Sequence, residues 1–212
     1  AEAAALALSD IAAPVAVAIE ARGARGVSRT AGRPEELFAH DGQITKAPIR
    51  AITLAALAPR AGEVLWDLGA GSGSVSVEWC LAAPGCRAGA VESRPDRIGN
   101  IRSNAARFGL SHVLSVVANN WQSALGALPR PDAVFVGGGA DSAGIETILA
   151  SVRPATRLVM NAVTLESEVL LADLHLAHGG SLVRIEIATA EPLGRMRGWR
   201  AARPVVQWSV ET

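Results

Sequence analysis

The sequence predicts an α/β protein with a doubly wound, mainly parallel sheet of seven strands and an antiparallel strand pair at the C-terminal end. From about residue 33 onward, short runs rich in Val and Leu alternate with helix-like segments, and Gly, Pro or Asp marks the junctions. Such alternation is typical of a parallel sheet with helices on both faces. The alternation breaks at Ala190 to Arg203, which is too rich in Gly, Pro and Arg for a crossover helix. We therefore expect the last two strands to be antiparallel.

Each expected strand is a run of mostly apolar residues bounded by turn-forming residues, as a buried strand requires. The first leads into a glycine-rich turn, and the second ends in a carboxylate. In chain order, the seven expected strands are Glu63 to Leu68, Arg87 to Glu92, Val113 to Ala118, Asp132 to Gly137, Arg157 to Ala162, Ser181 to Ala188 and Val205 to Val210.

The segments between these strands fit helices. Pro48 and Pro95 stand in the first turn of their helices, where a missing N–H breaks no hydrogen bond. The five expected helices are Pro48 to Leu57, Ser74 to Ala82, Pro95 to Phe108, Ser142 to Val152 and Leu165 to His178.

The composition argues against several classes of protein. With 50% hydrophobic and 19% charged residues among 212, the chain has the make-up of a globular protein with a substantial core. Twenty basic residues balance twenty acidic ones, so the chain lacks the excess positive charge that nucleic-acid and membrane-surface binding rely on. No apolar run approaches the ~20 residues that span a bilayer, and two cysteines make no disulfide framework. We expect no nucleic-acid or membrane partner and a cytoplasmic location.

The chain divides at about residue 33. Residues 1 to 32 start without a methionine, contain an alternating apolar stretch from Pro14 to Ile19, and run into the Gly- and Arg-rich stretch ARGARGVSRTAGRP. We expect this part to be a linker or the tail of a preceding module. Residues 33 to 212 are expected to form the main domain.

The strand EVLWDL, residues 63 to 68, runs directly into the turn Gly69, Ala70, Gly71, Ser72 and Gly73. Glycines let the backbone approach a ligand without a Cβ clash, and the free amides of the following helix face that ligand. One strand later, Glu92 provides a carboxylate that can accept hydrogen bonds from two ribose hydroxyls. Together the turn and the acid indicate a cofactor that carries a nucleoside.

The spacing narrows the choice of cofactor. A dinucleotide fingerprint places its third glycine where this chain has Ser74. The turn holds no Lys or Arg for phosphates, and Asp67 is a poor neighbour for a pyrophosphate. A GxGxG turn beside an acid suits a cationic sulfonium cofactor better. Two alternatives stay open, namely glycines that serve only tight packing between strand and helix, and a nicotinamide dehydrogenase.

Two motifs, DLGAGSG from Asp67 and AVES from Ala90, resemble the class I S-adenosylmethionine-dependent methyltransferases, which have a Rossmann-like fold. Other segments resemble, more narrowly, the decarboxylating precorrin methyltransferases of cobalamin (vitamin B12) biosynthesis. These segments are DGQITKAPIRA from Asp41, VFVGGG from Val134, NAVTLES from Asn161 and AEPLGRMRGWRAARPVVQW from Ala190. The resemblance covers nearly all of Arg33 to Val210.

This resemblance implies S-adenosylmethionine as cofactor and a precorrin, a tetrapyrrole, as substrate. It implies methylation of carbon 15 and loss of carbon dioxide from the acetate on carbon 12. It also implies a homotetramer. In a two-module form of the family, a preceding module methylates carbon 5, and residues 1 to 21 would then be the tail of that module.

The resemblance also assigns positions that bind the cofactor. They are Thr45, Gly69, Ala70, Gly71, Ser72, Gly73, Glu92, Asn120 and Trp121. Asn120 stands where the family commonly has an acid, but its amide oxygen can still accept a hydrogen bond from the adenine amino group. Pro48 stands where the family often has Glu, so any role of that carboxylate is missing here. Trp121 fits either packing on the adenine ring or an ordinary place in the core.

The substrate side is expected to be basic, because a precorrin bears many acetate and propionate carboxylates. Four arginines cluster in the irregular C-terminal segment, the last of them Arg203, and Trp199 lies among them. The alternative is a solvated charged loop. The candidate substrate-binding residues are Lys46, Arg50, Arg195, Arg197 and Arg200.

Methyl transfer from a sulfonium needs in-line approach of an electron-rich carbon, and holding the reactants in that geometry supplies much of the acceleration. We expect no metal, because only His175 and His178 show a ligand-like spacing and they fit a helix C-terminus. The catalytic residues are left unassigned, with Lys46, Glu78 and His40 as candidate proton donors. Two other classes stay open, namely a class I methyltransferase acting on another small molecule or on RNA, and a noncatalytic or redox nucleotide-binding domain.

Overall fold

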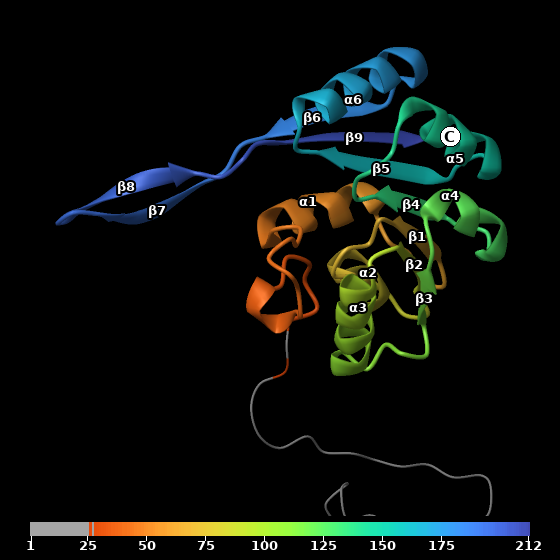
Figure 1. Cartoon of the computed structure of the whole chain (residues 1–212), viewed down its shortest axis with the longest axis horizontal. Helices are drawn as coiled ribbons and strands as arrows, with labels where there is room; N and C mark the ends of the chain where they lie inside the picture. The colour runs from red at the N-terminus through yellow and green to blue at the C-terminus, as the bar shows by residue number, and fades with distance from the viewer. Residues whose placement is uncertain (1–25, 27) are drawn as a thin grey trace, which may run out of the picture.

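The computed structural model describes residue 26 and residues 28–212, which form a seven-stranded sheet covered by helices on both faces, and a separate hairpin (Figure 1). Most of the expected linker or tail, residues 1 to 32, lies outside the described residues. The sheet strands are β1 (Val64–Leu68), β2 (Arg87–Glu92), β3 (Leu114–Ala118), β4 (Ala133–Val136), β5 (Arg157–Ala162), β6 (Ser181–Ile185) and β9 (Val205–Glu211).

The strand order is β3-β2-β1-β4-β5-β9-β6. Strands β1 to β5 pair in parallel, whereas β9 is antiparallel to both of its neighbours, β5 and β6. The prediction of a mainly parallel seven-stranded sheet that ends in antiparallel strands is confirmed. In this order the chain passes from β3 back across the sheet to β4, so the carboxyl ends of β1 and β4 lie side by side where ligands bind in open α/β sheets.

All five expected helices are present, each within one residue of its predicted ends. Three short elements were not expected, because a single turn is too short to show apolar periodicity. The helices are α1 (Ala47–Leu57), α2 (Ser74–Ala82), α3 (Pro95–Arg107), α4 (Trp121–Ala124), α5 (Ser142–Ser151) and α6 (Leu165–His178), with the 3₁₀ turns η2 (Glu35–Leu37) and η3 (Leu125–Ala127).

The sheet separates two hydrophobic cores, because alternate residues of each strand point to opposite faces. Leu65 of β1 packs with α1, α2 and α3, whereas its neighbour Trp66 packs with α4, α5 and α6. Each core also contains a fully buried tryptophan, Trp79 on the first face and Trp208 on the second. Both indole N–H groups donate to backbone carbonyls, at 3.0 and 2.9 Å, so neither ring carries an unpaired polar group into the core.

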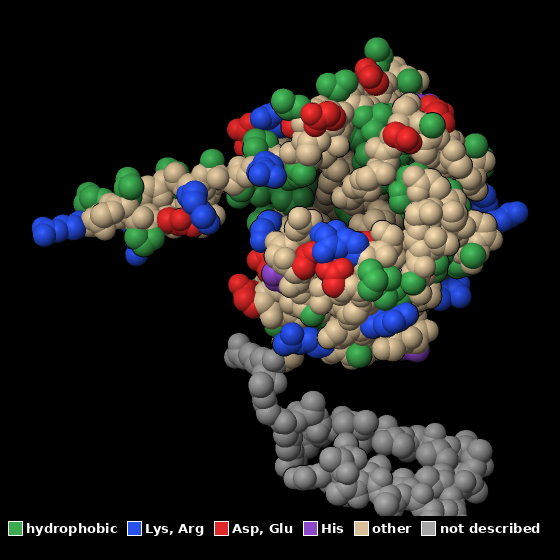
Figure 2. All heavy atoms as spheres, viewed as in Figure 1, with side chains coloured by type: hydrophobic (Ala, Val, Ile, Leu, Met, Phe, Trp, Pro, Cys, Tyr) green, Lys and Arg blue, Asp and Glu red, His purple; other side chains and the backbone are tan. Residues whose placement is uncertain are grey.

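The C-terminal region differs from the prediction at one place. The strand expected over Ser181 to Ala188 ends at Ile185, and the chain then leaves the sheet as a hairpin of β7 (Ala188–Leu193) and β8 (Met196–Ala201). The segment that the sequence indicated as irregular is therefore two paired strands. Because β6 ends and β9 begins at the carboxyl edge of the parallel strands, the hairpin projects from that edge, away from the body of the molecule (Figures 1 and 2).

A buried ion cluster joins the N-terminal part of the described chain to the sheet. The Glu78 carboxylate on α2 accepts hydrogen bonds from the backbone N–H groups of Gly32 and Arg33, at 2.7 and 2.8 Å, and pairs with Arg50 Nε at 2.9 Å. Arg50 is fully buried, and its other nitrogens donate to the carbonyls of Arg33 and Thr45. Because Glu78 and Arg50 each have several partners, the cluster holds the chain segment that leads into α1 in place.

None of the described helices is long and apolar enough to cross a membrane.

Candidate active site

The glycine turn lies between β1 and α2, at the carboxyl edge of the sheet. Gly69, Gly71 and Gly73 have φ values of 71, 60 and 70°, a region that side chains rarely allow. The turn is also crowded, because a Cβ on Gly137, after β4, would lie 2.7 Å from the Gly69 carbonyl oxygen, and a Cβ on Gly73 would lie 2.9 Å from Ile101. Glycine is therefore required for both conformation and close packing.

Glu92, at the end of β2, lies against this turn. Its side chain accepts a hydrogen bond from Gly71 N–H at 2.9 Å through one oxygen, and from Ser93 and Arg94 N–H at 2.9 and 3.0 Å through the other. The residue is 6% exposed. Three backbone donors thus hold the carboxylate beside the turn.

Asp67, on β1, provides a second and more deeply buried carboxylate. Oδ2 accepts hydrogen bonds from Ser76 N–H and Oγ–H, at 3.1 and 2.6 Å, whereas no described group hydrogen-bonds Oδ1. Burial raises the pKa of Asp67 to about 6, against the opposing effect of the Ser76 hydrogen bonds. Asp67 stands two residues before the glycine turn in the chain and keeps one buried carboxylate oxygen without a described hydrogen-bond partner.

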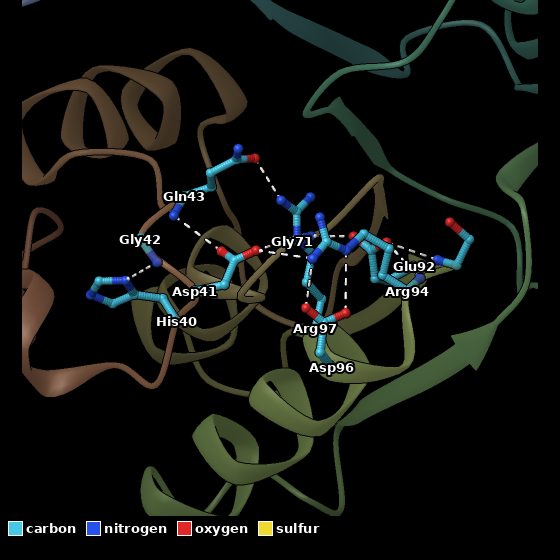
Figure 3. A network of polar contacts seen from close by, with 10 residues as sticks. His40, Asp41, Gly42, Gln43, Gly71, Glu92, Arg94, Asp96 and Arg97 are labelled. Carbon is cyan, nitrogen blue, oxygen red and sulfur yellow. Dashed lines mark hydrogen bonds and ion pairs between the residues drawn. The ribbon is translucent and has the colours of Figure 1, made fainter.

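A loop from Phe38 to Gln43, called the 38–43 loop, lies next to the turn and Glu92 (Figure 3). Its Asp41 carboxylate pairs with Arg97 Nε of α3 at 2.9 Å and with Arg94 at 3.7 Å. The hydrogen bond from Arg97 holds the pKa of Asp41 below its ordinary value. Thr45, expected to bind the cofactor, follows this loop and is partly exposed.

The segment after β3 comes near Glu92 through its backbone, because Asn119 N–H donates to the Glu92 carbonyl at 3.2 Å. Asn120 is exposed, and its amide oxygen caps α4 by accepting from Ser123 N–H at 2.9 Å. Trp121 is 6% exposed and belongs to the second core, where its ring lies against Gly144. Of the two alternatives for Trp121, this geometry favours the core residue.

The expected substrate-binding residues separate into two groups. Arg50 does not fit the expected basic wall, because burial and its bonds within the ion cluster leave it no surface for a substrate. Lys46 is exposed at the start of α1. The three remaining arginines, Arg195, Arg197 and Arg200, are exposed on the hairpin. Arg200 pairs there with Glu191 at 2.7 Å.

The three candidate proton donors differ in their exposure to solvent. Glu78 is buried in the ion cluster and paired with Arg50, so it cannot reach a substrate. His40 is exposed in the 38–43 loop, and its Nδ1 accepts a hydrogen bond from Gly42 N–H at 3.0 Å.

Among the described residues, no group of three or more His, Cys, Asp or Glu side chains is arranged to hold a metal ion.

Sequence reasoning missed Asn104, which contacts the turn from α3. Its side chain is fully buried and donates to the Ser72 carbonyl at 2.8 Å. The signal was present in the helical periodicity, because Asn104 falls between Ile101 and Ala105 on the buried stripe of an otherwise amphipathic helix. A polar residue at such a position must find a partner inside the protein.

The strand order, the reversed β9, the glycine turn after β1 and the acid after β2 together define a class I methyltransferase fold, and solved methyltransferases of low sequence identity share it. Residues 36–212 match the family model described as the precorrin methyltransferase domain, so the chain belongs to that family.

Proteins named as precorrin methyltransferases are similar to this chain along most of its length. The C-terminal domain of precorrin-6Y C5,15-methyltransferase from Rhodobacter capsulatus has a TM-score of 0.84 and 59% identity, over 88% of this chain and 100% of that one. A precorrin-6Y C(5,15)-methyltransferase [decarboxylating] from Sinorhizobium sp. is 50% identical over 88% of this chain and 45% of its own length. A cobalt-precorrin-6B C(15)-methyltransferase (decarboxylating) from Salmonella typhimurium is 31% identical over 81% and 91%. The chain thus spans about half the length of the first curated relatives it matches.

The raised pKa of Asp67 predicts a pH-dependent contribution to stability. Folding favours the protonated carboxyl, so this contribution is fully present below the ordinary pKa of 3.8 and is lost as the pH rises to about 6. Asp67→Asn removes that loss, and its stability relative to the unsubstituted protein should therefore rise by about 2 kcal/mol between pH 4 and 6. Urea denaturation at several pH values measures the difference. A difference that does not change with pH would show that Asp67 has an ordinary pKa.

Proposed function

We propose that this protein methylates a precorrin at carbon 15 with S-adenosylmethionine and removes carbon dioxide from the acetate on carbon 12, in cobalamin biosynthesis. The observation that carries the proposal is the placement of Glu92 against the glycine turn in a chain of the precorrin methyltransferase family. The relative from Salmonella typhimurium, named for carbon 15 alone, aligns over 91% of its length. The relatives named for carbons 5 and 15 align over about half, which supports fusion to a preceding carbon-5 module.

The residues at the turn fit S-adenosylmethionine, which carries a positive sulfonium and a positive ammonium. The unpaired, buried oxygen of Asp67 and the carboxylate of Glu92 both favour a cation, and no basic side chain lies in the turn to favour a phosphate. Glu92 would hold the ribose hydroxyls, and the backbone of Gly69 to Gly73 would lie against the nucleoside. We also propose cofactor contacts for Thr45, Ala70, Ser72 and Asn120, whereas Trp121 packs in the core behind the site.

The mechanism asks the protein chiefly to position the reactants. When bound, the cofactor supplies an electrophilic methyl group. The turn and Glu92 would hold it at the carboxyl edge, while the hairpin and Lys46 would hold the polycarboxylate macrocycle on the same side of the sheet, in the orientation that in-line transfer needs. Loss of carbon dioxide leaves an electron pair that passes into the conjugated macrocycle, which then takes up a proton. The exposed His40 and Lys46 are the remaining candidates to supply it.

We further propose a homotetramer in the cytoplasm. The hairpin exposes Leu193, Met196 and Trp199 by 70, 76 and 79%, and α6 exposes Leu165 and Leu176 by 75 and 86%. Large apolar side chains on a projecting hairpin are typical of a surface that another subunit covers. The two free, buried cysteines suit a reducing compartment. Light scattering at micromolar concentration should give about four times the chain mass, and a mass near 21.8 kDa would refute the assembly.

Glu92→Ala should weaken binding of S-adenosylmethionine and S-adenosylhomocysteine by about 1 to 3 kcal/mol, because two ribose hydroxyls lose their acceptor. Calorimetry on the purified protein measures this, and mass spectrometry of a precorrin intermediate incubated with the enzyme measures methylation and decarboxylation. Glu191→Ala, on the hairpin, is the matched control and should leave cofactor affinity unchanged. Wild-type affinity in the Glu92 variant would remove the ribose assignment.

Replacing Arg195 and Arg197 together by Ala should raise the KM for precorrin and leave S-adenosylhomocysteine affinity intact. Each exposed contact should contribute on the order of 1 kcal/mol, because water competes for the same carboxylates, and the loss should shrink at high salt. Steady-state kinetics at two ionic strengths provide the test, with light scattering to verify that the assembly is unchanged. Normal turnover with weakened cofactor binding would instead assign the hairpin to the cofactor site.

A further inference from the structure

The Asn104 side chain joins two segments that lie far apart in the sequence. Its Nδ2 donates to the carbonyls of Ala39 and Ser72, at 2.9 and 2.8 Å, and its Oδ1 accepts from Ala39 N–H at 2.7 Å. Ala39 belongs to the 38–43 loop and Ser72 to the glycine turn. One amide therefore uses both of its donor hydrogens and its acceptor to hold the loop and the turn against α3.

Burial makes this connection hard to replace. Asn104 is 0% exposed and the Ser72 carbonyl that it bonds is buried too, so water does not compete for this hydrogen bond. An apolar replacement would leave the Ser72 carbonyl and both backbone groups of Ala39 without that partner. The loop, rather than the helix, would be expected to yield, because α3 is also held by its own backbone and by Ile98 and Ile101 in the core.

A second contact fastens the same loop from the same helix. Arg97 lies seven residues before Asn104, two helical turns away and on the same side of α3. It pairs with Asp41 at 2.9 Å and donates to the Gln43 side chain at 2.5 Å (Figure 3). Unlike Asn104, Arg97 is partly exposed, with 17% of its side chain accessible. Salt can therefore screen the ion pair between Arg97 and Asp41, whereas the hydrogen bonds of the uncharged Asn104 amide are not screened.

We propose that Asn104 is a positioning residue of the cofactor site, which sets the 38–43 loop against the glycine turn before any ligand binds. The inference rests on the proposed function, because it takes the turn to be the cofactor site. Asn104 donates a hydrogen bond to the Ser72 carbonyl, and Glu92 accepts one from the N–H of Gly71, the adjacent residue of that turn. Fixing Ser72 from one side and Gly71 from the other leaves the turn little freedom, so ligand binding does not have to order it.

Asn104→Leu, which keeps the branched shape without hydrogen bonding, provides the test. S-adenosylhomocysteine is the probe, and its Kd, measured by calorimetry on folded protein, should rise about tenfold. Hydrogen exchange of the apo protein should accelerate at Phe38 to Gln43 and leave β5 and β9 unchanged. Gln207→Leu is the matched control: it removes another buried amide, bonded to Thr53 and Asn161 instead of the loop, and should leave the Kd and loop exchange unaltered.

Ala39→Pro serves as a second variant, because it removes the N–H that Asn104 accepts without altering α3, and it should raise the Kd in the same direction. If Asn104→Leu does not fold, this variant decides the question. Wild-type affinity and loop exchange in the variants that fold would overturn the positioning role. Failure of the unsubstituted protein to bind S-adenosylhomocysteine would instead contradict the proposed function, and the exchange measurement would still show whether Asn104 holds the loop.

Discussion

The close passage of two glycine-rich strand ends is the constraint on which the rest of the site depends. After β1 and β4 the backbones of Gly69 and Gly137 come so near that a Cβ on Gly137 would lie 2.7 Å from the Gly69 carbonyl oxygen. This contact is possible only because parallel neighbours end at the same edge of the sheet. It holds the turn close to the strand ends, where Glu92 from β2 and Asn104 from α3 can hydrogen-bond it.

Three buried carboxylates near this edge show how environment gives one functional group different roles. Glu78 meets two backbone donors and Arg50, and it holds the chain that leads into α1. Glu92 meets only backbone N–H groups, so its charge is held in place without being neutralised by a cation. Asp67 keeps one oxygen unpaired, and burial raises its pKa to about 6. The first therefore has a structural role, while the other two leave negative charge close to the glycine turn.

The hairpin has a different relation to the fold. It belongs to neither hydrophobic core, and it exposes a tryptophan, a methionine and three arginines beyond the carboxyl edge of the sheet. Along each strand alternate side chains share a face, so Arg197 and Trp199 lie on one side of β8 and Arg200 on the other, beside Glu191. Each face of the hairpin thus presents both an arginine and a large exposed apolar side chain, because Met196 lies on the same side as Arg200.

Features that depend on near neighbours along the chain could be predicted from the sequence. Strand and helix periodicity, the proline-started helices and the glycine turn were all predictable, because each reflects the conformational preferences of a few adjacent residues, and the motifs around Asp67 and Ala90 indicated the family. Contacts between groups far apart in the chain depend instead on the packing of whole elements. The tertiary structure buried Arg50 against Glu78, packed Trp121 on Gly144, paired the hairpin strands, and brought Asn104 to a loop 65 residues away. Such contacts follow from how whole elements pack, and no local pattern encodes the identity of a partner that many residues separate in the chain.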